Sequence, residues 1–111
     1  MIPRTHLGTA HVPGGDTLEL YSRGDDFMIV LDRNELMSTR MNGSEIALAA
    51  MTLQRLAGNA APHLLIGGYG MGFTLRAALA AGGPSLNVIV AEIVPEIIQW
   101  ARGPMADVTA G

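Results

Sequence analysis

A short glycine-rich segment at residues 67–72, of sequence GGYGMG, restricts the fold of this chain more than any other feature. Glycine has no Cβ atom, so it adopts positive φ angles and lets the backbone turn tightly or approach a ligand closely. An apolar run at residues 63–66 precedes the segment, and residues 72–81 follow it with helical periodicity. The pattern predicts a strand, a tight turn and a helix in succession.

A second strand and a second helix are predicted immediately afterwards. Residues 87–91 form another short apolar run, and Pro95 is suited to the first turn of a helix over residues 95–102. Runs of this kind are typical of strands that are buried on both faces. The alternation of strand and helix predicts a parallel sheet with right-handed crossovers.

The N-terminal part has a different pattern. Residues 1–15 are rich in glycine, proline and threonine, and we expect them to be poorly structured. Residues 17–22 and 27–32 alternate apolar and polar residues around a turn, which predicts a β-hairpin, and residues 35–38 are a candidate third strand. A helix is then expected from Asn42, with its side chain or that of Ser44 as the cap.

The predicted fold class is therefore α/β. It consists of an N-terminal β-hairpin element over residues 1–41, followed over residues 42–111 by a partial parallel sheet.

An acidic residue lies at the end of the second predicted strand, a position where such folds bind a ribose. Glu92 lies 20 residues after Gly72, at the end of the second predicted strand. A carboxylate in that place can accept hydrogen bonds from both hydroxyls of a ribose, and the start of the helix offers unpaired N–H groups. The residues alone leave two interpretations open, which are a nucleotide site and a purely structural turn.

The glycine spacing narrows the nucleotide class. The dinucleotide fingerprint requires a glycine at position 73, where this chain has Phe73. The spacing present is instead Gly68-x-Gly70-x-Gly72, the form used for S-adenosylmethionine. A P-loop is excluded because no Gly-Lys-Ser/Thr sequence occurs.

Composition argues against several kinds of partner, site and location. The net charge of −3 argues against a nucleic-acid partner, and the absence of cysteine excludes disulfides and thiolate metal sites. The three histidines lack second ligands at metal spacing, so no metal site is expected. No apolar run is long enough for a transmembrane helix and no signal-peptide pattern occurs, so we expect a cytoplasmic protein without a membrane partner.

Residues 64–76 and 90–97 closely resemble the spermidine synthase family, which has the class I methyltransferase fold. Residues 18–40, followed by Gly43-Ser44-Glu45, resemble that family's small N-terminal β domain and its entry helix. The resemblance implies that residues 42–111 are the first half of a Rossmann-like, methyltransferase-type domain that binds an S-adenosylmethionine-type ligand. The resemblance implies that the glycines line the methionine portion of S-adenosylmethionine, its decarboxylated form or methylthioadenosine. It also implies that Glu92 holds the ribose and that Ile93 packs on the adenine. The predicted cofactor-binding residues are Gly67, Gly68, Tyr69, Gly70, Gly72, Glu92 and Ile93.

The chain also departs from that family. It has Gly43-Ser44-Glu45 where the family carries a Tyr-His/Gln-Glu segment that contacts the polyamine. The family's acidic adenine contact and catalytic aspartate lie on later loops, beyond Gly111, so no catalytic residue is assigned. The predicted sheet would have an open apolar edge, covered by self-association or by a missing C-terminal half.

Three functions are consistent with these observations. The first is binding of an S-adenosylmethionine-type nucleoside within a spermidine synthase-like or methyltransferase-like transferase. The second is a non-catalytic assembly or regulatory domain of the same fold, and the third is an NAD- or FAD-binding half-domain. Tyr69 could stack on a ligand or cover the site in its absence.

Overall fold

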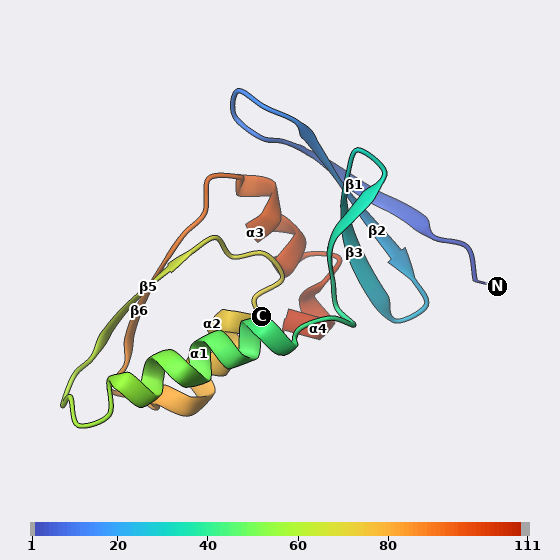
Figure 1. Ribbon diagram of the computed structural model, residues 1–111. Helices are drawn as coiled ribbons and strands as arrows, with labels where there is room; N and C mark the ends of the chain where they lie inside the picture. The colour runs from blue at the N-terminus through green and yellow to red at the C-terminus, as the bar shows by residue number, and fades with distance from the viewer. Residues whose placement is uncertain (1, 110–111) are drawn as a thin grey trace. The chain divides into compact units, whose positions relative to one another are not determined.

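The computed structural model describes residues 2–109 and shows a mixed α/β protein (Figure 1). The elements are β1 (Thr5–His11), β2 (Thr17–Arg23), β3 (Asp26–Leu31), β4 (Asn34–Ser38), α1 (Gly43–Arg55), β5 (His63–Gly67), α2 (Phe73–Gly82), β6 (Asn87–Ala91), α3 (Pro95–Arg102) and α4 (Ala106–Thr109). Strands β1 to β4 form an antiparallel sheet in chain order, and β5 pairs with β6 in a parallel sheet.

Two compact units make up the chain. One contains residues 1–41 together with residues 93–111, and the other contains residues 42–92. These contact units differ from the two domains expected from the sequence in one respect, since residues 93–111 group with the N-terminal part. Within residues 2–109, no helix combines the length and the apolar character that crossing a membrane requires.

The predicted hairpin and third strand are confirmed. Strands β2 and β3 pair antiparallel up to Arg23 and Asp26, and β4 extends the sheet beyond β3. The β3–β4 turn contains Asp32 and Arg33, whose φ angles are 48° and 69°. Positive φ at both central residues defines a turn whose twist matches that of the flanking strands.

The prediction of a poorly structured segment over residues 1–15 is wrong. Strand β1 occupies Thr5–His11 and pairs with β2, with an irregularity in register between His6 and Gly8. Only Ala10 of this strand is fully buried, so β1 has almost no apolar alternation that a sequence pattern could reveal. Backbone pairing with the edge of β2 forms the strand despite its composition.

Helix α3 packs on β1 through a close contact between Trp100 and Gly8. Trp100 is only 7% exposed, and a Cβ atom added to Gly8 would lie 2.6 Å from its indole nitrogen. Trp100 shares the buried face of α3 with Ile97 and Ala101, at the helical spacing of three and four residues. The α4 turn follows, and the Thr109 hydroxyl donates to the Ala101 carbonyl oxygen at 2.6 Å.

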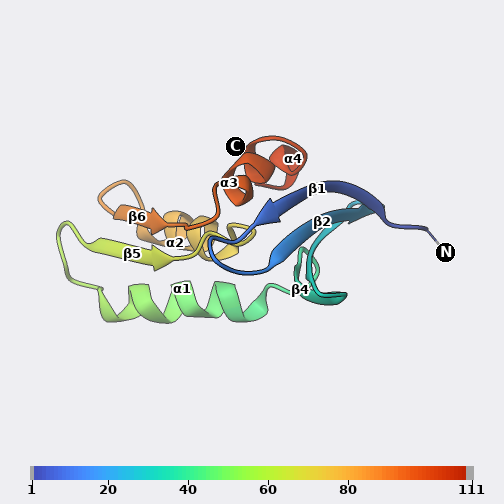
Figure 2. The same cartoon turned by 90° about the horizontal axis from the view of Figure 1, so that it is seen from above.

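In the unit of residues 42–92, helices α1 and α2 pack together on one face of the parallel strand pair, as the two views show (Figures 1 and 2). The core between them contains Ala49, Ala78 and Leu86, with Leu64 and Val88 of the strands packed against it. Small alanine side chains let the two helices approach closely. The predicted strands, helices and parallel pairing of this region are confirmed.

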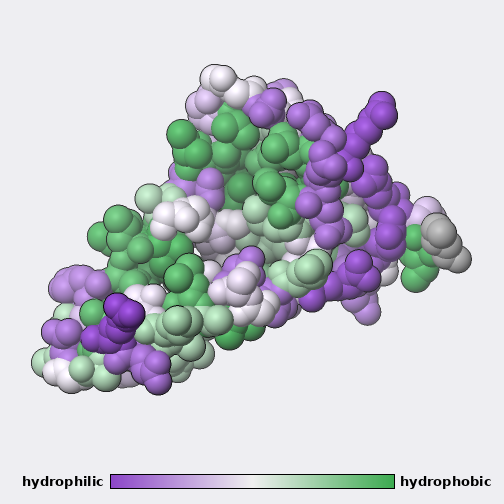
Figure 3. Space-filling model, viewed as in Figure 1, coloured by the Kyte–Doolittle hydropathy of each residue, from purple (hydrophilic) through white to green (hydrophobic). Residues whose placement is uncertain are grey.

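Two details of that region differ from the expectation. The side chain of Asn42 makes no capping hydrogen bond at the start of α1. Strands β5 and β6 are not buried on both faces, because Leu65 and the paired Ile89 are each 69% exposed. Both helices cover the same face, so the alternate side chains of each strand face solvent. Apolar surface is visible over these strands in the space-filling view (Figure 3).

We expect Gly8→Ala to lower the free energy of unfolding by about 1–3 kcal/mol, because the added methyl group would overlap the buried indole of Trp100. Urea denaturation followed by tryptophan fluorescence measures this change. Gly15→Ala is the matched control, since a Cβ atom there would lie 3.7 Å from Val12, an ordinary contact. Equal stability of the two variants would contradict the expected overlap.

Candidate functional site

The parallel register of β5 and β6 brings the glycine-rich turn next to Glu92. The last paired residues are Gly67 and Ala91, so Gly68 and Glu92 leave the sheet side by side. The Gly68 N–H extends the pairing by donating to the Ala91 carbonyl oxygen at 2.7 Å. This edge, at the carboxyl ends of parallel strands, is where open α/β sheets bind their ligands.

The turn requires glycine at the three positions of the predicted spacing. Gly68, Gly70 and Gly72 have φ angles of 86°, 58° and 79°, a region that residues with a Cβ atom rarely adopt. The Gly72 N–H donates to the Tyr69 carbonyl oxygen at 2.9 Å, and Gly72 is the N-cap of α2. Around Gly67 and Gly68 an added Cβ atom would meet nothing within 4 Å, so this side of the turn is open.

A hydrogen bond links Glu92 directly to the turn. The backbone N–H of Tyr69 donates to Oε1 of Glu92 at 2.7 Å. Bonds to an ionised carboxylate are shorter and stronger than neutral ones, so this contact fixes both the carboxylate and the turn. Glu92 as a whole is partly exposed.

The side chain of Tyr69 lies against Gly72. A Cβ atom added to Gly72 would lie 2.7 Å from Cζ of the tyrosine ring and 2.5 Å from its hydroxyl oxygen. The half-buried ring thus covers the last glycine of the turn.

Arg76 is a further component of this site, although its place one turn into the predicted helix favours a solvated surface residue over a carboxylate clamp. Its Nη1 donates to the Met71 carbonyl oxygen at 2.9 Å, and its guanidinium carbon lies 4.8 Å from the centre of the Phe73 ring. Arg76 follows Gly72 by four residues, which is one helical turn. This spacing alone does not predict whether the arginine side chain lies against the turn or extends into solvent.

Six of the seven predicted site residues therefore lie together in the unit of residues 42–92. The seventh, Ile93, is 68% exposed and belongs to the other unit. Among residues 2–109, no group of three or more His, Asp or Glu side chains is placed to hold a metal ion.

Comparison with known proteins assigns the chain to no family. No protein-family model matches the chain, and no curated protein matches it either.

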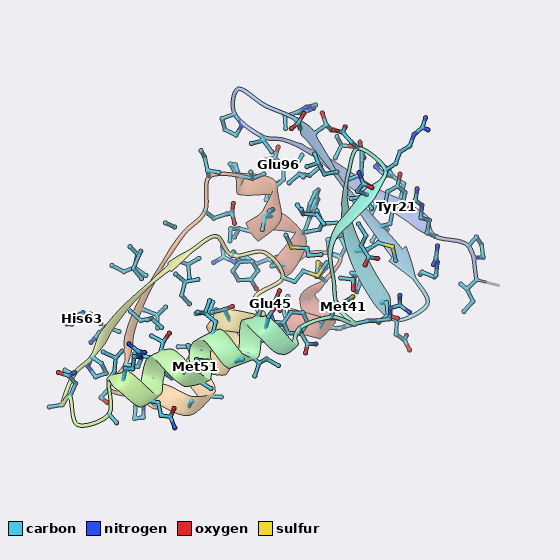
Figure 4. All side chains as sticks on the ribbon, in the orientation of Figure 1. Tyr21, Met41, Glu45, Met51, His63 and Glu96 are labelled. Atoms are coloured by element: carbon cyan, nitrogen blue, oxygen red, sulfur yellow. The ribbon has the colours of Figure 1, made fainter. Side chains whose placement is uncertain are left out.

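A second polar cluster lies on β1 and β2, outside the turn. The Thr9 hydroxyl donates to Oε2 of Glu19 at 2.7 Å, and the His6 ring also pairs with this oxygen. His6 packs edge-on against Tyr21, whose ring lies 4.0 Å from the Arg4 guanidinium carbon (Figure 4 labels Tyr21). The hydrogen bond from Thr9 and the interaction with His6 lower the pKa of Glu19 below its usual value.

We expect Glu92→Ala to speed hydrogen exchange at the Tyr69 amide by about tenfold to a hundredfold, because a hydrogen bond to a charged group stabilises by roughly 1.5–3 kcal/mol. Hydrogen–deuterium exchange followed by NMR measures this rate. Glu92→Gln retains an acceptor oxygen and is the matched control, with a smaller expected effect. An unchanged exchange rate in Glu92→Ala would show that the bond does not protect this amide.

We expect Thr9→Val to raise the pKa of Glu19, because the largest interaction that favours its ionised form is removed. A depressed pKa in the folded state stabilises the protein above the pKa of the unfolded state, and this stabilisation is lost as pH falls through the folded pKa. The variant therefore has a weaker loss of stability on acidification. NMR titration of the Glu19 carboxyl carbon measures the pKa, and Thr5→Val on the same strand is the control.

Proposed function

We propose that the turn at residues 67–72 and Glu92 bind an S-adenosylmethionine-type nucleoside, within a spermidine synthase-like or methyltransferase-like protein of Rossmann-like fold. The observation that supports this most is the carboxylate of Glu92 fixed beside the glycine turn, at the carboxyl ends of two parallel strands.

In this proposal the carboxylate binds the ribose. The Tyr69 N–H uses Oε1 of Glu92, but an ionised carboxylate has about four lone-pair sites and can accept hydrogen bonds from hydroxyls as well. The open space around Gly67 and Gly68 lets a ligand approach the backbone. Ile93, exposed and next in the chain, would pack on the adenine.

The ligand class follows from the turn and from the resemblance described above. S-adenosylmethionine, its decarboxylated form and methylthioadenosine have no pyrophosphate to bind at the start of the helix, and the third glycine of the dinucleotide fingerprint is replaced by Phe73. This favours the adenosyl ligands over NAD or FAD.

The reaction proposed for a complete protein is methyl or aminopropyl transfer. A nucleophile attacks a carbon bonded to the sulfonium, that carbon–sulfur bond breaks, and the thioether leaves with the electron pair. The residues at the turn would contribute by holding the nucleoside in one orientation, and positioning of this kind lowers the barrier substantially. No general base is assigned.

A second candidate function is assembly or regulation without catalysis. The exposed apolar pair Leu65 and Ile89 on the strands favours it, together with Ile46, Leu48 and Met51 on α1 (Figure 4 labels Met51). Exposed apolar patches of this kind are typical of surfaces that contact another protein. Self-association, or a further segment of chain packed over the strands, would bury it.

Calorimetric titration of the chain with S-adenosylmethionine, methylthioadenosine and NAD tests the proposal. We expect heat with the two adenosyl ligands, and a weakening of about a hundredfold or more in Glu92→Ala, because two hydrogen bonds from the ribose to a charged group are lost. Glu96→Ala, on α3, is the matched control with unchanged affinity.

Absence of heat with all three ligands would favour the assembly function. Tight binding of NAD alone would overturn the choice of ligand class.

A further inference from the structure

Two side chains with hydrogen-bond donors converge on the last glycine of the turn. Nη1 of Arg76 and the hydroxyl oxygen of Tyr69 would each lie 2.5 Å from a Cβ atom added to Gly72. Because both distances are measured from the same point, the two atoms lie at most 5.0 Å apart. A guanidinium and a phenol hydroxyl are thus placed together at the end of the turn.

Two contacts with uncharged groups hold the guanidinium there. Met71 accepts one hydrogen bond through its carbonyl oxygen, and the Phe73 ring lies beneath the cation. Neither the Met71 carbonyl oxygen nor the Phe73 ring carries a formal negative charge that would neutralise the cation. Arginine presents five N–H donors, and one of them donates to Met71.

A cation in this position favours a ligand that has a carboxylate. Guanidinium and carboxylate groups match in geometry and charge, and the tyrosine hydroxyl can donate to the same group. S-adenosylmethionine and S-adenosylhomocysteine have a carboxylate on the amino-acid portion. Decarboxylated S-adenosylmethionine has only an ammonium there, which the guanidinium would repel, and methylthioadenosine has neither group.

We infer that Arg76, assisted by Tyr69, is a specificity-determining residue that selects nucleosides with a carboxylate on the sulfur-bearing tail. This inference rests on the proposed function, because it assumes that the tail lies over the glycine turn. It assigns the site to methyl donors and their products rather than to aminopropyl donors.

Calorimetric titration of the whole chain with S-adenosylhomocysteine, methylthioadenosine and decarboxylated S-adenosylmethionine tests the inference. We expect S-adenosylhomocysteine to bind about tenfold to a hundredfold more tightly than methylthioadenosine, since its carboxylate makes charge-assisted hydrogen bonds. In Arg76→Gln this ratio falls to about one while methylthioadenosine binds as before, and decarboxylated S-adenosylmethionine binds more tightly than to the unaltered chain.

Two variants complete the experiment. Arg55→Gln removes an exposed cation from the end of α1 and is expected to leave the ratio unchanged. Tyr69→Phe removes only the hydroxyl and is expected to reduce the ratio less than Arg76→Gln does. Amide NMR spectra of each variant establish that the unit of residues 42–92 stays folded, so that a change in ratio reports on selection rather than on folding.

The outcomes separate this inference from the proposed function. If methylthioadenosine and S-adenosylhomocysteine bind equally well, and Glu92→Ala weakens both, the proposed nucleoside site stands and selection by Arg76 is overturned. The same holds if Arg76→Gln weakens both ligands by one factor. If none of the ligands binds, the proposed function falls and the inference falls with it.

Discussion

The parallel pairing of β5 with β6 is the constraint on which the candidate site depends. Its register ends at Gly67 and Ala91, so the chain leaves both strands at the same level. The Gly68 N–H to Ala91 bond and the Tyr69 N–H to Glu92 bond continue this pairing beyond the sheet. A shift of one residue would turn every side chain of a strand to the opposite face and would separate the carboxylate from the turn.

Helices cover only one face of the β5–β6 pair, so the pair has one buried face and one exposed face. Helices α1 and α2 cover the face with Leu64 and Val88, while Leu65 and Ile89 remain exposed on the other. Parallel sheets are ordinarily covered on both faces, because their crossover helices lie on both sides. The apolar residues of each strand therefore serve two surfaces, of which one is the core and the other is available for contact.

Two opposite charges lie at the two ends of the glycine-rich turn. The carboxylate of Glu92 lies where the turn begins, bonded to the Tyr69 amide, and the guanidinium of Arg76 lies where it ends, beside Gly72. Tyr69 takes part in both regions, through its backbone at one end and its ring at the other. The nucleoside proposed above, with hydroxyls at one end and a carboxylate at the other, would complement this order of charges.

The local pattern of the chain determined most of the secondary structure. The hairpin, the β5–α2–β6–α3 succession and the need for glycine at positions 68, 70 and 72 follow from periodicity, turn residues and the absence of a Cβ atom. The proximity of Glu92 to the turn was also predictable, because parallel strands end at a common edge. These features depend on residues close together in sequence, or on a single register.

Only the tertiary structure decided the remaining features. Strand β1 forms because β2 offers it an edge, and Trp100 is buried because Gly8 leaves room for its indole, although these two residues are far apart in sequence. Leu65 is exposed because the helices pack on the opposite face of the strands. The side chains of Arg76 and Tyr69 both lie against Gly72, an arrangement that their sequence positions do not specify. The spacing of apolar and charged residues predicts which helices and strands form. Whether a given side chain is buried, and what it contacts, depends on neighbours that are distant in the sequence.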